Sequence, residues 1–287
     1  MTKSESDEPT DDWLEHVNAE LSRRDVSHKQ RPWEAWFEWS RYARVSASLD
    51  DKDVKKIFDW FEKNTKAGSQ YFGPMYEGTL YYDSCFWPIV IPVVAGRVRL
   101  DASNSLKTMP DSIKSRLTKN KQEFVQYAAV WADCIDYAFG IEGLWNGTSP
   151  NAFGQDCFRS GHPQLNATVT LLLESIPNSK AMECSRMATE MFLKGFLASK
   201  AGLTENEAKS NIGHNLSKAL DMCLDIEQHS ELQVIQSDLT LFPEIADRYK
   251  GTNKSAIELW HGYGIAQFTG ATVIRSLTGR DVRRTLR

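Results

Sequence analysis

Apolar side chains recur at helical spacing along most of this chain, and that periodicity constrains its fold more than any other feature. The clearest case is the segment 123–140, in which large apolar residues return every three or four positions until Gly140. Such a pattern is typical of a buried helix. Shorter segments with the same spacing lie on both sides of it, so the sequence predicts a mainly α-helical protein.

Composition limits the class of protein. The chain has 287 residues, of which 41% are apolar and 25% are charged, as in ordinary globular proteins. This length suffices for one large domain or for two of typical size. The net charge of −4 excludes a strong overall attraction to nucleic acid, although a local basic cleft is compatible with it.

The cysteines and the lack of targeting patterns predict a cytoplasmic protein. The five cysteines show no C-x-x-C spacing, which favours reduced thiols over disulfides or a zinc site. Residues 1–10 are polar and acidic, so they predict a disordered tail and not a secretory signal. No run approaches the ~20 apolar residues that cross a bilayer, so no membrane association is expected. Nucleotide-binding and metal-binding motifs are missing too, and we expect neither a cofactor nor a metal.

Residues 11–145 predict an aromatic-rich helical region that carries one β-hairpin. Three amphipathic helices are expected at its start, near 11–24, 31–44 and 51–68. The hairpin is expected near 88–101, because β-branched residues there are interrupted by a turn at Ala95–Gly96. Pro88 and Pro92 would confine its first strand to the edge of a sheet.

The rest of the chain predicts a linker followed by a second helical region. Residues 146–164 are dense in Gly, Pro, Ser and Asn, which is typical of a linker or a long functional loop. Residues 165–287 then predict a bundle of helices joined by short turns. Two capping boxes, Thr204–Glu207 and Ser255–Glu258, mark helix starts in this region.

Segments of this second region resemble the HEPN superfamily. Arg186–Leu197 is similar to the long helix of that family, in which an acidic residue precedes a Leu-Lys-Gly-like step. Ile212–Leu216, with the sequence Ile-Gly-His-Asn-Leu, resembles the step that opens the next core helix. Leu241–Tyr249 resembles a segment that often follows in bacterial members. The resemblance covers about residues 165–278 and implies an up-down helical bundle that forms a homodimer.

The resemblance also implies a candidate active site at His214. HEPN ribonucleases carry an arginine, four to six residues and then a histidine at the dimer cleft, and they act without metal. A neutral imidazole accepts the proton of the ribose 2′-hydroxyl, while a fixed cation stabilises the charge that develops on the phosphate. Four residues separate Lys209 from His214, so lysine stands where the ribonucleases of the family have arginine. Lysine lacks the bidentate fork of arginine, so this change is not conservative at a phosphate site.

Four further residues are candidates for ligand binding near His214. Asn211 and Asn215 flank it and are able to orient the imidazole or a phosphate. Glu190 and Lys194 lie four apart on the predicted long helix, where such a pair is expected to be a solvated ion pair.

These residues leave three hypotheses open. The first is an HEPN-like binding or interaction module for RNA, a nucleotide or a protein partner, in the bacterial stress or defence context that the resemblance implies. The second is a metal-independent endoribonuclease in which His214 is the general base and Lys209 its electrostatic partner. The third is a purely structural or regulatory dimer, in which the aromatic N-terminal half recognises a protein. The Gly-His-Asn-Leu step would then be structural: Gly213 allows a tight turn, and Asn215 or His214 caps the following helix.

Overall fold

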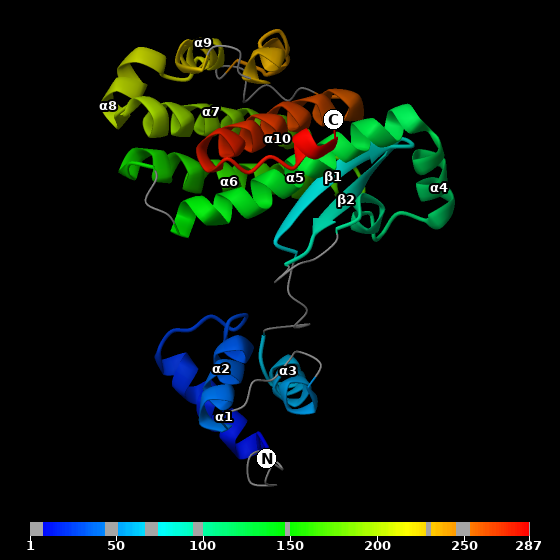
Figure 1. Cartoon of the computed structure of the whole chain (residues 1–287), viewed down its shortest axis with the longest axis vertical. Helices are drawn as coiled ribbons and strands as arrows, with labels where there is room; N and C mark the ends of the chain where they lie inside the picture. The colour runs from blue at the N-terminus through cyan, green and yellow to red at the C-terminus, as the bar shows by residue number, and fades with distance from the viewer. Residues whose placement is uncertain are drawn as a thin grey trace. The chain divides into compact units, whose positions relative to one another are not determined.

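The chain divides into two compact units, Met1–Gly73 and Pro74–Arg287. The computed structural model describes residues 8–43, 51–66, 74–93, 100–146, 150–227, 231–244 and 253–286. In these ranges the N-terminal unit is helical, and the C-terminal unit combines long helices with one β-hairpin (Figure 1).

The boundary between the units differs from the predicted one. The sequence predicts a linker at 146–164, but helix α6 spans Ala152–Leu172. Helix α5, Lys121–Asn146, packs in the same unit as the helices that follow it. Asn151 starts α6, because its side chain accepts a backbone N–H of the first turn at 2.8 Å. The linker prediction was wrong because Gly154, Gly161 and Pro163 lie inside this helix, and the two glycines allow α7 to approach closely.

In the described ranges, the N-terminal unit contains three helices. They are α1 (Asp11–Arg23), α2 (Arg31–Ala43) and α3 (Lys52–Asn64). Thr10 caps α1, since its hydroxyl accepts the N–H of Trp13 at 3.2 Å. The three apolar faces meet in one core, made of Leu14, Val17, Leu21, Ala35, Trp39, Val54, Ile57 and Phe61. Most of the predicted disordered tail, residues 1–7, lies outside the described residues.

Four long helices form the bundle of the C-terminal unit. They are α5, α6, α7 (Lys180–Ala201) and α10 (Ala256–Thr278). Helix α7 packs against α6 and α10 and also against α9 (Leu216–Ile226), which Figure 1 shows on the outer side of the bundle. Shorter segments complete the unit: Ala102–Ser105, α4 (Asp111–Lys119), α8 (Glu205–Glu207), the π-helical turn Ala208–Ile212, and the 3₁₀ turns Glu231–Ile235, Asp238–Leu241 and Arg283–Leu286. The predicted mainly helical fold with a small hairpin is confirmed.

None of these helices, in the ranges that the structure describes, combines the length and the hydropathy that a bilayer span requires.

The β-hairpin lies earlier in the chain than the sequence predicts. Its antiparallel strands are β1 (Tyr76–Tyr82) and β2 (Cys85–Ile91). Asp83 and Ser84 connect them with positive φ at both residues, as a two-residue type I′ turn requires. The predicted turn at Ala95–Gly96 lies outside the described residues. Pro88 is tolerated inside β2 because each strand of a two-stranded sheet has one unpaired edge.

Buried hydrogen bonds attach the hairpin to the bundle. The Tyr76 hydroxyl donates to Oε1 of Gln267 on α10 at 2.5 Å. Tyr263, one turn earlier on α10, donates to the same oxygen at 3.2 Å and accepts the N–H of Thr79. Because buried polar groups must be paired, these contacts fix the hairpin in one position on the helices.

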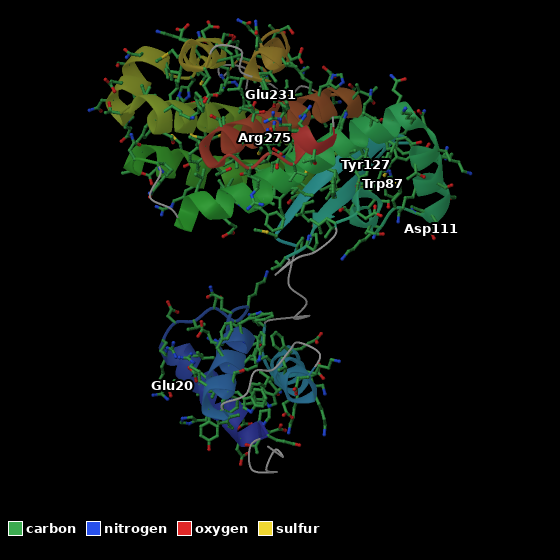
Figure 2. The ribbon with its side chains drawn as sticks, in the orientation of Figure 1. Glu20, Trp87, Asp111, Tyr127, Glu231 and Arg275 are labelled. Carbon is green, nitrogen blue, oxygen red and sulfur yellow. The ribbon has the colours of Figure 1, made fainter. Side chains whose placement is uncertain are left out.

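A charged cluster attaches the C-terminal segment to the bundle. Arg275 on α10, labelled in Figure 2 beside Glu231, contacts carboxylates of Asp133 and Asp136 on α5 at 2.7 and 3.3 Å. The Asp136 carboxylate also accepts the N–H of Val282 at 2.7 Å. Burial raises the pKa of both aspartates, so their ion pairs with arginine are needed to keep them charged.

Because α5 and α10 pack closely, replacing two glycines of α5 by alanine should have opposite effects on stability. A Cβ at Gly140 would lie 2.0 Å from the Ile274 side chain, whereas a Cβ at Gly143 would meet nothing within 4 Å. Gly140→Ala should therefore destabilise the C-terminal unit by about 1–3 kcal/mol. Gly143→Ala should stabilise it by about 0.5–1 kcal/mol, because alanine is the better helix former. Urea unfolding measures both, and a destabilising Gly143→Ala would contradict this description of α5.

The partly buried environment of His162 predicts that the C-terminal unit loses stability in mild acid. Its ring nitrogens lie 3.0 Å from the Tyr137 hydroxyl and 2.9 Å from the Asn166 amide, and burial lowers its pKa below the ordinary 6.5. The unfolded chain therefore takes up this proton at a higher pH than the folded chain does. The free energy of unfolding should fall as the pH falls from about 7 to about 5. His162→Gln should flatten this dependence, and His261→Gln, at an exposed position on α10, should not.

Candidate functional site

Three charged side chains lie on one face of α7. Arg186, Glu190 and Lys194 are spaced four residues apart, so each lies one helical turn from the next. The Glu190 carboxylate contacts Arg186 Nη1 at 3.3 Å and Lys194 Nζ at 2.7 Å. All three residues are buried. The sequence predicts a solvated Glu190–Lys194 ion pair, and this was wrong, because α9 and the turn before it cover this face of α7.

A tight turn brings His214 to that face. Gly213 has φ 58° and ψ −117°, and the N–H of Asn215 donates to the carbonyl of Ile212 at 3.1 Å. These are the features of a type II′ turn, in which glycine favours the position with positive φ. The residues Ile212–Asn215 are called the His214 turn from here on.

The three side chains of α7 contact two carbonyls and the imidazole of the His214 turn. Lys194 Nζ donates to the Gly213 carbonyl at 2.7 Å, and Arg186 Nη2 donates to the His214 carbonyl at 2.8 Å. Nδ1 of His214 lies 3.0 and 3.3 Å from the two oxygens of Glu190. We call this arrangement of Arg186, Glu190, Lys194 and the His214 turn the clasp.

The clasp orients the His214 imidazole. The side chain of Glu190 is only 3% exposed, whereas that of His214 is 68% exposed. An ionised carboxylate only accepts hydrogen bonds. Nδ1 of His214 therefore carries a proton and donates a hydrogen bond to Glu190. In the neutral ring Nε2 is then an unprotonated acceptor on the exposed side. The arrangement can accept a proton at Nε2, or donate a hydrogen bond from it once the ring is protonated.

The structure brings only some of the predicted residues together. Lys209 forms an exposed ion pair with Glu205 at 2.7 Å, and within the described part of the chain it makes no hydrogen bond or ion pair with His214. Asn211 is exposed and accepts a hydrogen bond from its neighbour in the chain, Ser210. Asn215 caps α9, because its side chain accepts a backbone N–H at 2.9 Å, as the structural hypothesis expects.

Arg186 is the functional residue that the sequence analysis missed. It was noted only as the first residue of the helix motif. The available signal was its distance of four residues from Glu190, which places the two on the same side of a helix as Lys194. The hydrogen bond from Arg186 to the His214 carbonyl depends on the packing of segments 28 residues apart. The spacing of residues along one helix does not predict such a contact.

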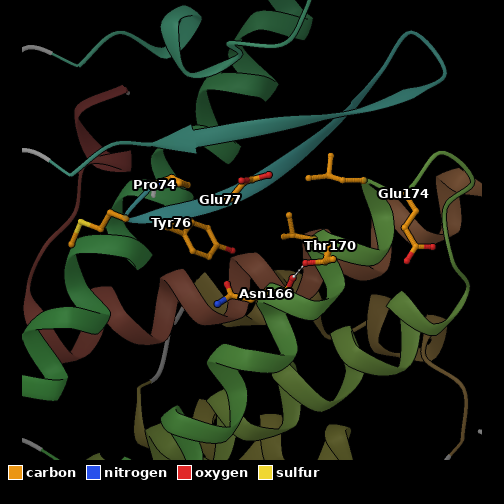
Figure 3. A pocket seen from close by; sticks show the side chains of 9 residues that line it. Pro74, Tyr76, Glu77, Asn166, Thr170 and Glu174 are labelled. Carbon is orange, nitrogen blue, oxygen red and sulfur yellow. Dashed lines mark hydrogen bonds between the residues drawn. The ribbon is translucent and has the colours of Figure 1, made fainter. Parts of the chain in front are cut away.

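One cavity of the C-terminal unit lies away from these residues. A cavity of about 530 Å³ opens between β1 and α6 (Figure 3). It is lined by Pro74, Met75, Tyr76, Glu77, Asn166, Val169, Thr170, Leu173 and Glu174. None of the predicted site residues lines it. Across the described ranges, no group of three or more His, Cys, Asp or Glu side chains is placed to hold a metal ion.

Comparison with models of protein families, with curated proteins and with solved structures found no match to this chain. The HEPN resemblance therefore depends only on the three sequence segments given above. Arg186–Leu197 lies within α7, and Ile212–Leu216 forms the His214 turn and the first residue of α9, the helix that packs against α7. Part of the third segment, 245–249, lies outside the described residues.

Removing the central charge of the clasp should destabilise the C-terminal unit. Glu190→Gln leaves Arg186 and Lys194 buried without a counter-charge, which should cost about 3 kcal/mol. The matched control is Glu205→Gln, which breaks an exposed glutamate–lysine pair with the same spacing and should leave the urea midpoint unchanged. Equal effects of the two substitutions would contradict the role given to Glu190.

Proposed function

We propose that the chain is an HEPN-like binding module that holds a phosphate group of RNA or of a nucleotide at the His214 turn. The observation that supports this most strongly is an exposed imidazole fixed by a buried carboxylate. An exposed side chain without a function does not require a buried charged group to fix its orientation. Catalytic and binding residues, in contrast, are commonly held by groups behind them.

The electrostatics of the clasp favour an anionic ligand. Arg186 and Lys194 against Glu190 leave one formal positive charge next to the imidazole, and a protonated His214 adds another. The His214 turn also leads directly into α9, whose first N–H groups have no acceptor within the helix. A phosphate bound at His214 would lie near the positive end of that helix.

The wider context of the proposal comes from the family resemblance alone. It includes a homodimer, a protein partner that the dimer recognises, and a role in bacterial stress or defence. A cytoplasmic location is also proposed, and it is supported by the cysteine spacing and not by the resemblance. Sedimentation of the purified chain tests the dimer, and a monomer at all concentrations would remove the shared cleft from the proposal.

Ring signals of His214 should report ligand binding directly. In ¹H–¹³C NMR spectra of the full chain, the His214 signals are assigned as those lost in His214→Ala. Titration with a short RNA should shift these signals, because the ring contacts the phosphate, and His214→Ala should weaken binding at least about fivefold. His261→Ala, a second exposed histidine of the same unit, is the matched control and should change nothing. Unshifted His214 signals at saturating RNA would refute the proposed site.

A second candidate is a metal-independent endoribonuclease. It is favoured by the orientation of His214, because Nδ1 faces Glu190 and leaves Nε2 as an exposed base for the ribose 2′-hydroxyl. The cation for the phosphate would be Lys209, which would first have to leave Glu205, or the buried charges of the clasp.

Incubation of RNA with the chain in EDTA separates this candidate from binding alone. The nuclease hypothesis expects products with 2′,3′-cyclic phosphate ends and a loss of about 10²–10⁴ in rate for His214→Ala. Lys209→Ala should slow the reaction only if Lys209 is the cation. RNA that stays intact with both the unmodified chain and His214→Ala would exclude the nuclease. If RNA binding were absent as well, the purely structural or regulatory dimer would remain.

A further inference from the structure

The N-terminal unit has a basic groove along the exposed face of α3. The groove has a volume of about 700 Å³. It is lined by Asp11, Lys52, Lys55, Lys56, Asp59, Trp60, Lys63 and Asn64. Four lysines against two aspartates give this lining a net positive formal charge, although the chain as a whole is acidic.

The amphipathic pattern of α3 produces this groove. Val54, Ile57 and Phe61 are buried in the core of the unit. The lysines therefore lie on the opposite, exposed side, and they extend over three turns of the helix. Lys52 and Lys63 are eleven residues apart, which corresponds to ~16 Å along the helix.

Three of the groove's lysines have no carboxylate partner among the described residues. Among the described residues, Lys52, Lys56 and Lys63 form no ion pair within 4 Å. The two acidic side chains of the lining, Asp11 and Asp59, also form none. Lys52, Lys56 and Lys63 are thus available to an external anion, and the distance they span exceeds the size of a single phosphate.

Trp60 gives the groove a second kind of contact. Its ring is partly exposed, lies among the lysines and packs edge-on against Phe61 with a centroid distance of 5.1 Å. Phe61 is fully buried, so it holds the indole in place. A flat aromatic surface among cations matches a polyanion that also carries planar groups.

We infer that this groove binds single-stranded nucleic acid, with Lys52, Lys56 and Lys63 on successive phosphates and a base stacked on Trp60. A duplex keeps its bases stacked inside and offers none to Trp60, whereas acidic peptides and anionic membranes lack bases. The site belongs to the N-terminal unit and does not depend on the His214 turn.

The test measures binding of the full chain to a short labelled oligouridylate at low salt. The triple variant Lys52→Glu, Lys56→Glu and Lys63→Glu should bind at least about tenfold more weakly, and the slope of log affinity against log salt should fall by about 2. The matched control reverses three exposed lysines of the C-terminal unit, Lys107, Lys119 and Lys121, with the same change in net charge. Equal weakening by both triple variants would overturn the inference.

Trp60 distinguishes nucleic acid from other anions. Trp60→Leu should weaken oligouridylate binding at least about fivefold, and Trp60→Phe, which keeps an aromatic face, should restore much of it. Binding of inorganic polyphosphate, which has no bases, should be unchanged by either variant. Far-UV circular dichroism checks that both variants fold. If the Trp60 variants weakened binding of polyphosphate and of oligouridylate equally, the inference would be overturned. It would also be overturned if the lysine reversals weakened binding to phosphatidylserine vesicles more than binding to RNA.

RNA binding by His214→Ala distinguishes this groove from the site of the proposed function. If His214→Ala abolished RNA binding and the α3 lysine reversals had no effect, the groove would be refuted and the proposed function would stand. If only the lysine reversals weakened binding, the proposed function would be refuted and the groove supported.

Discussion

The buried carboxylate of Glu190 is the interaction on which the described site depends. A charge in a protein interior is costly unless it is paired and hydrogen-bonded, and Glu190 is paired with Arg186, Lys194 and His214. Each of the two cations also donates a hydrogen bond to a carbonyl of the His214 turn. One acidic residue on α7 therefore makes it favourable for a segment some twenty residues later to fold onto the same helix.

This arrangement joins the site to the core of the C-terminal unit. Helix α7 packs against α6, α9 and α10, so the clasp is built on a helix that three others hold in place. The buried cluster around Arg275 works differently, since it joins α5 to the C-terminal segment. Both clusters position chain segments, but only the clasp ends in an exposed imidazole.

Helix periodicity predicted what depends on local sequence. The starts of α1, α2, α3 and α10, and the Gly-His-Asn-Leu turn, follow from caps and spacing within a few residues. Errors arose where distant packing decides. The stretch 146–164 contains most of α6, because Gly154 and Gly161 pack against α7. The Glu190–Lys194 pair is buried, because α9 and the His214 turn cover it. The role of Arg186 depends on a carbonyl 28 positions away, which no local pattern shows.

The tautomer of the His214 ring tests the central claim most directly. Ring ¹⁵N shifts of the full chain, measured well above the ordinary histidine pKa, show which nitrogen carries the proton. The clasp predicts a proton on Nδ1, because Glu190 accepts it there, and an unprotonated Nε2. A ring protonated at Nε2, or one that exchanges between both forms as in a free side chain, would contradict the claim that Glu190 holds His214.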